Sequence, residues 1–142
     1  MEPITSFKDR YSFLSNFYPH PIEFEGVRFP TSEHAFQAAK SLDPTDRQKI
    51  AELATPGKAK AAGKRVKLRK DWNDIRVAIM TTILRIKFAD PNLKEALLAT
   101  GDAPLIEGNT WNDTFWGVCR GKGQNNLGRI LETIRAELRA IV

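Results

Sequence analysis

The residues best suited to chemistry lie in the segment PTSEHAFQAAK, residues 30–40. On a helix, Glu33, Gln37 and Lys40 project from one side, within about 40° of one another. A carboxylate, an amide and an amine in such a row have the groups needed to move protons or to attack an electrophilic carbon. The same spacing is also typical of an ordinary amphipathic helix with its polar side in water, and spacing alone does not separate the two interpretations.

A second candidate segment, NDTFWGVCRGKGQNNLG, spans residues 112–128. Three glycines surround two cations just before a predicted helix: Gly117, Gly121 and Gly123 with Arg120 and Lys122. Backbone N–H groups, a helix N-terminus and cations in this arrangement favour a bound phosphate. The segment matches neither the P-loop nor the dinucleotide fingerprint, so a plain connecting loop is the alternative interpretation.

The two histidines and the lone cysteine are the remaining candidates for metal binding or nucleophilic catalysis. His20 lies in a proline-rich turn and no acidic or cysteine pair stands at ligand spacing, so His34 is interpreted as a packed or supporting residue. Cys119 lies in the glycine-rich segment without an evident partner base, which argues against a nucleophilic thiol. We therefore expect neither a metal ion nor a cofactor.

An aromatic stretch near the N-terminus, YSFLSNFYP, is interrupted by Ser15 and Asn16. It fits two descriptions: a plug at the edge of a strand that fills the core, or a wall on which a flat base stacks.

Composition points to a soluble globular protein. The 142 residues are 42% hydrophobic and 27% charged, which is close to the average for globular domains. Repeats and linkers are absent from the pattern, so one domain over residues 1–142 is expected. No signal peptide or membrane span is recognisable, and with Cys119 as the lone cysteine the expected location is the cytoplasm.

The net charge of +5 is unevenly distributed along the chain. Residues 58–70, KAKAAGKRVKLRK, hold seven Lys or Arg and no acid. Such a run indicates either attraction to an anionic partner, nucleic acid included, or merely a solvated basic surface.

The elements expected to position these residues are mostly helical. Alternation around a break at Gly26 predicts a hairpin over residues 22–29, and Thr31 or Ser32 is expected to cap the first helix. Helices are predicted over 32–42, 45–54, 56–63, 73–88, 92–99 and 125–141. The fold class is therefore α+β, a single compact helix-rich domain with a small sheet or hairpin.

Two of these helices carry long apolar stripes. Residues 73–88 are expected to form the central, most buried helix, with a stripe made of Ile75, Ile79, Thr82, Ile83 and Ile86 and extended by Val77, Met80 and Leu84. The last helix has a narrower stripe, made of Leu127, Leu131, Ile134, Leu138 and Ile141.

The combination of motifs is more specific than any one of them. FLSNFYPHPIEFEGVRFPTSEHAFQAAK followed by NDTFWGVCRGKGQNNLGRILETIRAEL strongly resembles the NADAR family, also called YbiA-like proteins, from about Phe7 to the end of the chain. The resemblance implies a YbiA-like fold and N-glycosidase activity, the hydrolysis of a bond between ribose C1 and a base-like nitrogen. It implies two substrate classes, which are phosphorylated ribosylamino-pyrimidine intermediates of riboflavin biosynthesis and ADP-ribosylated guanine in nucleic acid.

The same resemblance implies roles for particular residues. The catalytic residues it implies are Glu33, Lys40 and Asp113. The substrate-binding residues it implies are Asn16, Phe17, Gln37, Trp116, Gly117, Gly121, Gly123 and Asn125.

Two chemical routes fit these catalytic residues. In direct hydrolysis, Glu33 and Asp113 stabilise an oxocarbenium-like state, activate water and protonate the leaving nitrogen. In the covalent route, Lys40 attacks the sugar C1 and forms a Schiff base that water releases. The alternative function is a non-catalytic module that binds ADP-ribose or nucleic acid.

Overall fold

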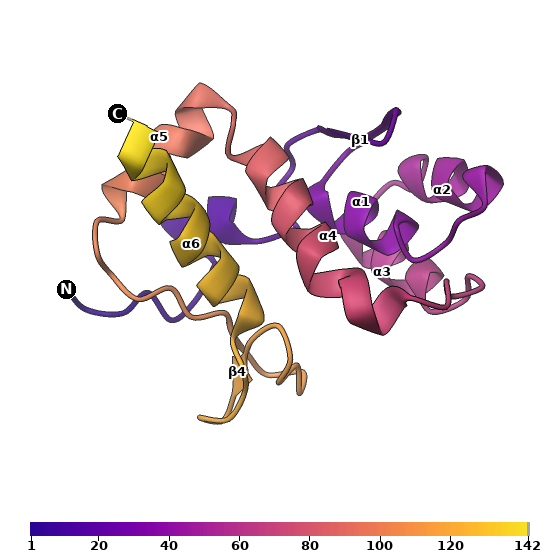
Figure 1. Ribbon diagram of the computed structural model, residues 1–142. Helices are drawn as coiled ribbons and strands as arrows, with labels where there is room; N and C mark the ends of the chain where they lie inside the picture. The colour runs from indigo at the N-terminus through magenta and orange to yellow at the C-terminus, as the bar shows by residue number, and fades with distance from the viewer. Residues whose placement is uncertain (142) are drawn as a thin grey trace. The chain divides into compact units, whose positions relative to one another are not determined.

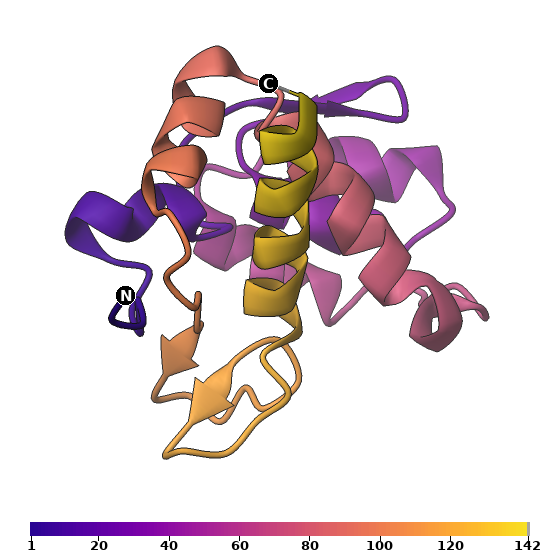
Figure 2. The same cartoon turned by 60° about the vertical axis from the view of Figure 1, so that its left-hand side comes forward.

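The computed structural model describes residues 1–141 as a helix-rich chain with two small sheets, which confirms the α+β class (Figures 1 and 2). Its contacts divide the chain into two compact units. Unit 1 consists of Met1–Ser15 together with the chain from Phe88 onward, and unit 2 consists of Asn16–Lys87. The expectation of one domain over residues 1–142 stays a prediction.

Unit 2 begins with the expected hairpin. Strands β1 (Ile22–Phe24) and β2 (Val27–Phe29) pair antiparallel. The two turn residues, Glu25 and Gly26, have φ angles of 48° and 81°, the combination that a tight two-residue hairpin requires. Ile22, Phe24 and Phe29 are buried while Glu23 and Arg28 are exposed, so one face of the hairpin joins the core.

Helix α1 (Ser32–Ala38) lies at the centre of unit 2 and packs against α2, α3 and α4 (Figure 1). Thr31 caps it, because the Thr31 hydroxyl oxygen accepts the His34 main-chain N–H at 3.2 Å. All seven residues of α1 are buried. The helix ends at Ala38 rather than near Leu42, because the chain turns immediately afterwards, and it is α1 rather than the helix over 73–88 that is most buried.

Three more helices surround α1. Helix α2 (Pro44–Ala51) is capped by the Asp43 carboxylate and α3 (Pro56–Gly63) by the Thr55 hydroxyl, and both have proline in the first turn, where no intrahelical N–H bond is lost.

The buried face of helix α4 (Trp72–Lys87) differs from the apolar stripe predicted for it. Its buried face carries Met80, Ile83 and Leu84, whereas Val77 and Thr82 are exposed. Isoleucine and valine side chains lie on several sides of this helix, so helical periodicity alone did not show which side faces the core. Packing against α1 and β1 decides which side is buried.

Unit 1 contains a 3-10 helix (Asp9–Leu14), α5 (Pro91–Ala99) and α6 (Asn126–Ile141). The aromatic YSFLSNFYP stretch thus starts as a 3-10 helix and not as a strand edge. Figure 2 shows α5 and α6 side by side, with the short parallel strands β3 (Gly108–Asn109) and β4 (Val118–Cys119) before α6.

The apolar stripe of α6 is confirmed over most of its length, since Leu127, Leu131 and Ile134 are buried. Its C-terminal end departs from the expectation, because Ile141 is exposed. Within residues 1–141 we find no helix with the length and apolarity needed to cross a membrane.

Candidate active site

The polar row of α1 is not a solvated face. Glu33 is only 8% exposed and Gln37 only 5%, so the interpretation of this row as a wet helix side is wrong. The Gln37 side-chain amide donates to the Glu33 carboxylate Oε2 at 2.5 Å. A buried carboxylate requires such a hydrogen-bond donor, because desolvation would otherwise disfavour its charge.

Lys40 lies in the turn that follows α1, one turn of chain beyond Gln37, and its main-chain N–H donates to the Gln37 carbonyl at 3.2 Å. The side chain is half-buried. Burial lowers the pKa of the Lys40 amine, nearby Glu33 raises it, and Lys64 and Lys60 lower it further, with a net lowering. A lowered pKa increases the fraction of neutral amine, which is the nucleophilic form.

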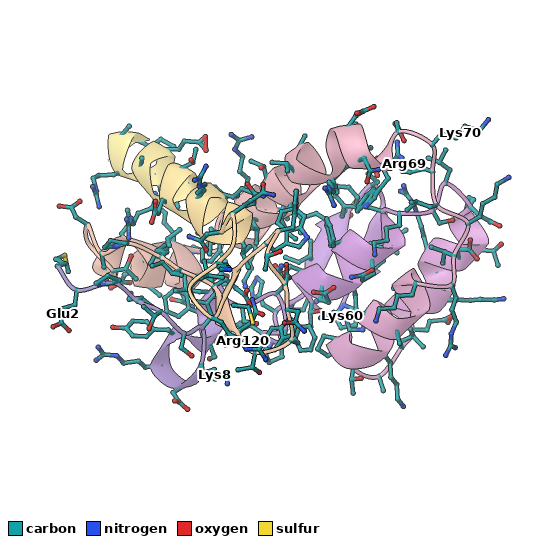
Figure 3. The ribbon with its side chains drawn as sticks, turned by 90° about the horizontal axis from the view of Figure 1, so that it is seen from below. Glu2, Lys8, Lys60, Arg69, Lys70 and Arg120 are labelled. Atoms are coloured by element: carbon teal, nitrogen blue, oxygen red, sulfur yellow. The ribbon has the colours of Figure 1, made fainter. Side chains whose placement is uncertain are left out.

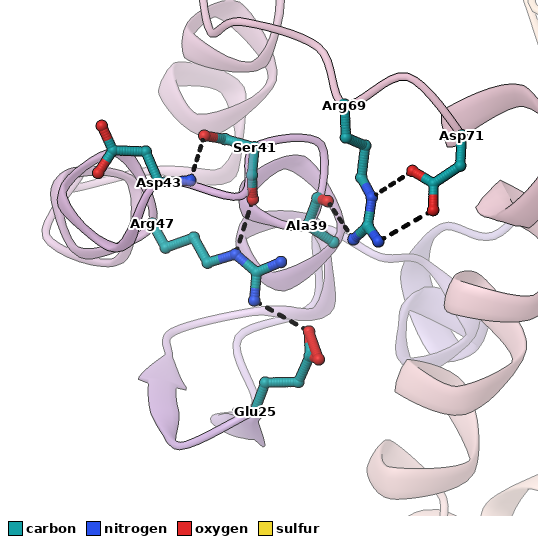
Figure 4. A network of polar contacts seen from close by, with 7 residues as sticks. All are labelled: Glu25, Ala39, Ser41, Asp43, Arg47, Arg69 and Asp71. Carbon is teal, nitrogen blue, oxygen red and sulfur yellow. Dashed lines mark hydrogen bonds and ion pairs between the residues drawn. The ribbon is translucent and has the colours of Figure 1, made fainter.

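The main chain on one side of Lys40 is held by Arg69 (Figure 4). The Arg69 main-chain N–H donates to the Lys40 carbonyl at 2.8 Å, and its guanidinium donates to the Ala39 carbonyl at 3.4 Å. The guanidinium also binds Asp71 in bidentate fashion, at 2.7 and 3.2 Å. Arg69 therefore fixes the turn that carries Lys40.

The main chain on the other side is held by Arg47 of α2. Its guanidinium donates to the Ser41 carbonyl at 2.8 Å and to Glu25 of the hairpin turn at 2.9 Å (Figure 4). The Ser41 hydroxyl in turn donates to Asp46 at 2.8 Å. The sequence interpretation missed both arginines, since Arg69 was counted only as part of the basic run, although an acid two residues later was a signal of local pairing.

Gly63, at the end of α3, determines where the Gln37 side chain lies. A Cβ atom built on Gly63 would overlap the Gln37 side-chain oxygen. That oxygen, Oε1, is buried and has no hydrogen-bond partner. The close approach of the glycine backbone is therefore what holds the Gln37 amide nitrogen toward Glu33.

We expect Gly63→Ala to lower kcat by about tenfold to a hundredfold, because displacing Gln37 also displaces the Glu33 carboxylate. Steady-state kinetics measure the change, and thermal unfolding shows that the fold is kept. Gly57→Ala in the same helix is the matched control, since a Cβ there would meet no atom closer than 3.9 Å. Equal kcat values in the two variants would contradict a positioning role for Gly63.

Asn16 accepts hydrogen bonds from the N-terminal end of α1. Its side-chain oxygen accepts from the Ser32 hydroxyl at 2.8 Å, and its main-chain carbonyl accepts the Glu33 N–H at 3.1 Å. Asn16 is buried, whereas Phe17 beside it is 45% exposed. The contacts of Asn16 position Glu33, and substrate contact by Asn16 or Phe17 stays a prediction.

His34 is a packed residue, as expected. It is fully buried, with Nδ1 at 2.7 Å from the Thr31 hydroxyl and Nε2 at 3.0 Å from the Leu53 carbonyl. Because a carbonyl accepts only from a donor, Nε2 carries the proton and Nδ1 accepts from Thr31. Burial lowers the pKa of His34, so the ring is neutral in the fold.

This neutral histidine predicts a pH effect on stability. The unfolded chain binds a proton at His34 near pH 6.5, but the folded chain binds it only at lower pH. The free energy of unfolding is therefore expected to fall as the pH drops below about 6.5. Urea unfolding across this range should show a shallower fall for His34→Gln than for the wild type, and an unchanged slope would exclude His34 as the cause.

Lys87, at the end of α4, is a second buried amine that the sequence interpretation missed. It is 1% exposed, and burial lowers its pKa to about 7. Its Nζ lies 5.6 Å from the centroid of the Tyr18 ring. Helical periodicity places a lysine in solvent by default, so the sequence held no signal for this burial.

In unit 1, Asp113 holds the turn that it belongs to. Its Oδ1 accepts the main-chain N–H groups of Phe115 at 3.2 Å and Trp116 at 2.9 Å. Asn109 bonds both the N–H and the carbonyl of Asp113. The second carboxylate oxygen, Oδ2, has no hydrogen-bond partner in the described part of the chain. The Trp116 ring packs edge-on against Phe115, with centroids 4.8 Å apart.

Several N–H groups of the glycine-rich segment donate to acceptors within the segment. Cys119 and Lys122 bond each other's main chain, and the N–H groups of residues 124–127 donate to the carbonyls of residues 114–117. At the start of α6, the N–H groups of Asn126 and Leu127 are thus already bonded. Gly121 and Gly123 have φ angles of 76° and 149°, which the tight turn requires.

Two predicted binding residues of this segment, Asn125 and Gly117, have structural contacts. The Asn125 amide accepts from the Glu107 N–H and donates to the Leu105 carbonyl, both at 2.9 Å. Gly117 packs so closely on Glu107 that a Cβ atom would overlap its side chain. A phosphate held by Asn125 or Gly117 stays a prediction that these contacts do not favour.

Cys119 is buried, and its Sγ lies 3.8 Å from the Asn112 side-chain oxygen. Over residues 1–141, no group of three or more His, Cys, Asp or Glu side chains is placed to hold a metal ion.

The predicted site residues thus divide between the units. Unit 2 brings together Glu33, Gln37 and Lys40, with Asn16 and Phe17 preceding their helix. Unit 1 brings together Asp113, Trp116, Gly117, Gly121, Gly123 and Asn125. A buried carboxylate near an amine of lowered pKa provides groups of the kind that acid–base or covalent catalysis uses.

The chain belongs to the NADAR family, whose domain matches residues 5–139. It is 42% identical over 137 residues to the N-glycosidase YbiA of Escherichia coli, covering 94% of this chain and 85% of that protein. It is 37% identical over 139 residues to an N-glycosidase of Nostoc punctiforme, with coverage of 93% and 88%. These names confirm, for the family, the expected hydrolase of N-glycosyl bonds.

Structural comparison gives the same relationship. The NMR structure of Escherichia coli YbiA matches with a TM-score of 0.87 and 38% sequence identity, over 99% of this chain and 88% of that one. The expected YbiA-like fold is therefore confirmed. A riboflavin biosynthesis protein of Vibrio vulnificus is also 40% identical over 134 residues, which cover 92% of this chain and 36% of that protein.

Proposed function

We propose that this protein hydrolyses the bond between a ribose C1 and the nitrogen of a base or base-like group. The observation that carries the proposal is the buried Glu33–Gln37 pair next to Lys40, whose pKa burial lowers. Burying a carboxylate and an amine near each other costs desolvation energy, and groups with perturbed pKa values cluster at functional sites. The N-glycosidase names of the relatives agree with this chemistry.

In the route that we favour, the neutral Lys40 amine attacks C1. A bond forms between Nζ and C1 while the C1–N bond breaks, and the leaving nitrogen keeps the electron pair and takes a proton from solvent. Glu33 takes the proton that the alkylated lysine loses. The ribose ring then opens with a proton on its oxygen, which gives a Schiff base, and water adds to C1 to release the sugar and restore the amine.

Direct hydrolysis is the competing route. There Glu33 stabilises an oxocarbenium-like state, and Asp113 is proposed as the second carboxylate. Asp113 Oδ1 already holds its turn, which leaves Oδ2 to exchange a proton. Asp113→Asn preserves the Oδ1 contacts, so it tests the proton-exchange role without removing the turn.

The proposed substrates are phosphorylated ribosylamino-pyrimidine intermediates of riboflavin synthesis. Relatives from Vibrio vulnificus and from Zea mays carry riboflavin biosynthesis names, and this favours such a substrate. ADP-ribose on guanine in nucleic acid offers the same C1–N bond and is the alternative substrate. The proposed binding residues are Asn16, Phe17, Gln37, Trp116, Gly117, Gly121, Gly123 and Asn125.

Turnover of the two substrates is the test of this function. The protein is incubated with the ribosylamino-pyrimidine phosphate and, separately, with an oligonucleotide that carries ADP-ribosylated guanine. Release of free base and sugar is followed by chromatography and mass spectrometry. Release from either substrate, lost in Glu33→Gln, supports the proposal, whereas tight binding of both without release would indicate the non-catalytic module.

A further inference from the structure

Helix α3, which packs against α1, carries Lys60 within it and Lys64 as its C-terminal capping residue. Ala59 and Gly63 are its buried residues, and Gly63 lies against Gln37 of α1. Lys60 and Lys64 each follow one of these buried positions, so they lie one turn apart on a single side of α3. Figure 3 labels Lys60 on this helix. We call these two residues the α3 lysine pair.

The α3 lysine pair is close to Lys40 in electrostatic terms. Both members lower the pKa of the Lys40 amine, and Glu33 is the acid that opposes them. The charge of Lys64 thus lies close enough to the Lys40 amine to act on it, and such a charge attracts an anion.

The basic run, residues 58–70, contains no acid. Asp71, just beyond the run, is ion-paired with Arg69. Lys64 is exposed and makes no ion pair with any residue between Met1 and Ile141. A ligand that reaches Lys40 therefore meets a cation, Lys64, that is not ion-paired within the described residues.

The glycine-rich segment of unit 1, for which the sequence predicts a phosphate site, has several N–H groups that are already bonded within the chain. The N–H groups of Asn126 and Leu127, at the start of α6, donate to the carbonyls of Phe115 and Trp116, and both polar groups of the Asn125 amide are bonded. Phosphate recognition by a helix N-terminus needs N–H groups that are free to donate.

We propose that the α3 lysine pair is the subsite for a phosphate monoester on the sugar of the substrate, so that the enzyme selects phosphorylated ribosides. This inference rests on the proposed function and adds the residues that hold the phosphate of its substrate. Lysine binds phosphate as a mobile point charge, and two lysines one turn apart meet a dianion from two sides. The phosphate would face the ammonium group of Lys64, which makes no ion pair among residues 1–141.

The test compares Lys64→Gln with Lys58→Gln on a phosphorylated N-riboside and its dephosphorylated counterpart. Lys58 is exposed on the same helix and is the matched control. We expect Lys64→Gln to lower the ratio of the two kcat/KM values by about tenfold or more, the loss typical of one charge-assisted contact. Lys64→Arg should keep most of the ratio and Lys58→Gln all of it. An equal effect of Lys64→Gln and Lys58→Gln on the ratio would overturn the subsite.

Binding of ribose 5-phosphate, followed by NMR titration, separates this inference from the proposed function. We expect weaker binding to Lys64→Gln than to Lys58→Gln. If no N-riboside is cleaved but this difference persists, the proposed function fails and the subsite stands. If cleavage occurs and the two variants bind ribose 5-phosphate equally, the subsite fails alone.

Discussion

Replacing Lys40 with alanine is expected to lower kcat on the order of 10³-fold or more, because the covalent route loses its nucleophile. The fold should survive, since the main chain around position 40 is held by Arg69 and Arg47 and not by the Lys40 side chain. Single-turnover kinetics measure the chemical step, and thermal unfolding checks the stability.

The pH dependence of kcat/KM is a second test of Lys40 as the nucleophile. Burial lowers the pKa of Lys40 from its ordinary value of 10.5, so the neutral amine is present at lower pH than for a solvated lysine. We therefore expect kcat/KM of the wild type to rise with pH through this lowered pKa. Lys40→Arg keeps the charge without a usable nucleophile and should be as inactive as Lys40→Ala. Turnover within about tenfold of the wild type in both variants would favour direct hydrolysis.

Replacing Glu33 with glutamine is expected to cost about 10² in kcat or more, the second largest effect. The carboxylate serves both routes, as a proton acceptor or as a stabiliser of positive charge at C1. Glutamine has nearly the same shape and still presents an oxygen to the Gln37 amide, so the buried pair is kept.

Glu23→Gln is the control for this change, because Glu23 is a solvent-exposed carboxylate of the same unit, on β1. It should leave kcat unchanged. If Glu33→Gln had wild-type kinetics as well, Glu33 would be a buried packing residue of α1 and not a catalytic one.

Local signals accounted for what the sequence predicted well. The hairpin followed from alternation around Glu25–Gly26, two positions where the backbone takes positive φ. The start of α1 followed from a threonine cap. Both features depend on a few neighbouring residues, so a short stretch of sequence specifies them.

Features set by distant packing were the ones missed. Glu33 and Gln37 are buried because α2, α3 and α4 surround α1, and helical spacing has no information on that enclosure. The roles of Gly63 and Arg69 likewise depend on contacts with residues about 26 to 30 positions away, Gln37 and Ala39. A basic run and a helix-end glycine look alike whether they face solvent or a site.

The glycine-rich segment shows the same limit at shorter range. Its glycines correctly indicated unusual backbone angles at Gly121 and Gly123. The pairing of N–H groups at the start of α6 with the 114–117 carbonyls could not be inferred, because composition does not specify which main-chain groups face each other.

The most direct test of the central claim is borohydride trapping during turnover, followed by mass mapping of the modified peptide. The covalent route predicts a reduced sugar adduct on Lys40 that is absent from Lys40→Ala. Lys87 is the internal comparison, because its amine also has a lowered pKa but is 1% exposed. A protein that turns over substrate yet gives no adduct, or gives the adduct on Lys87, would contradict the account.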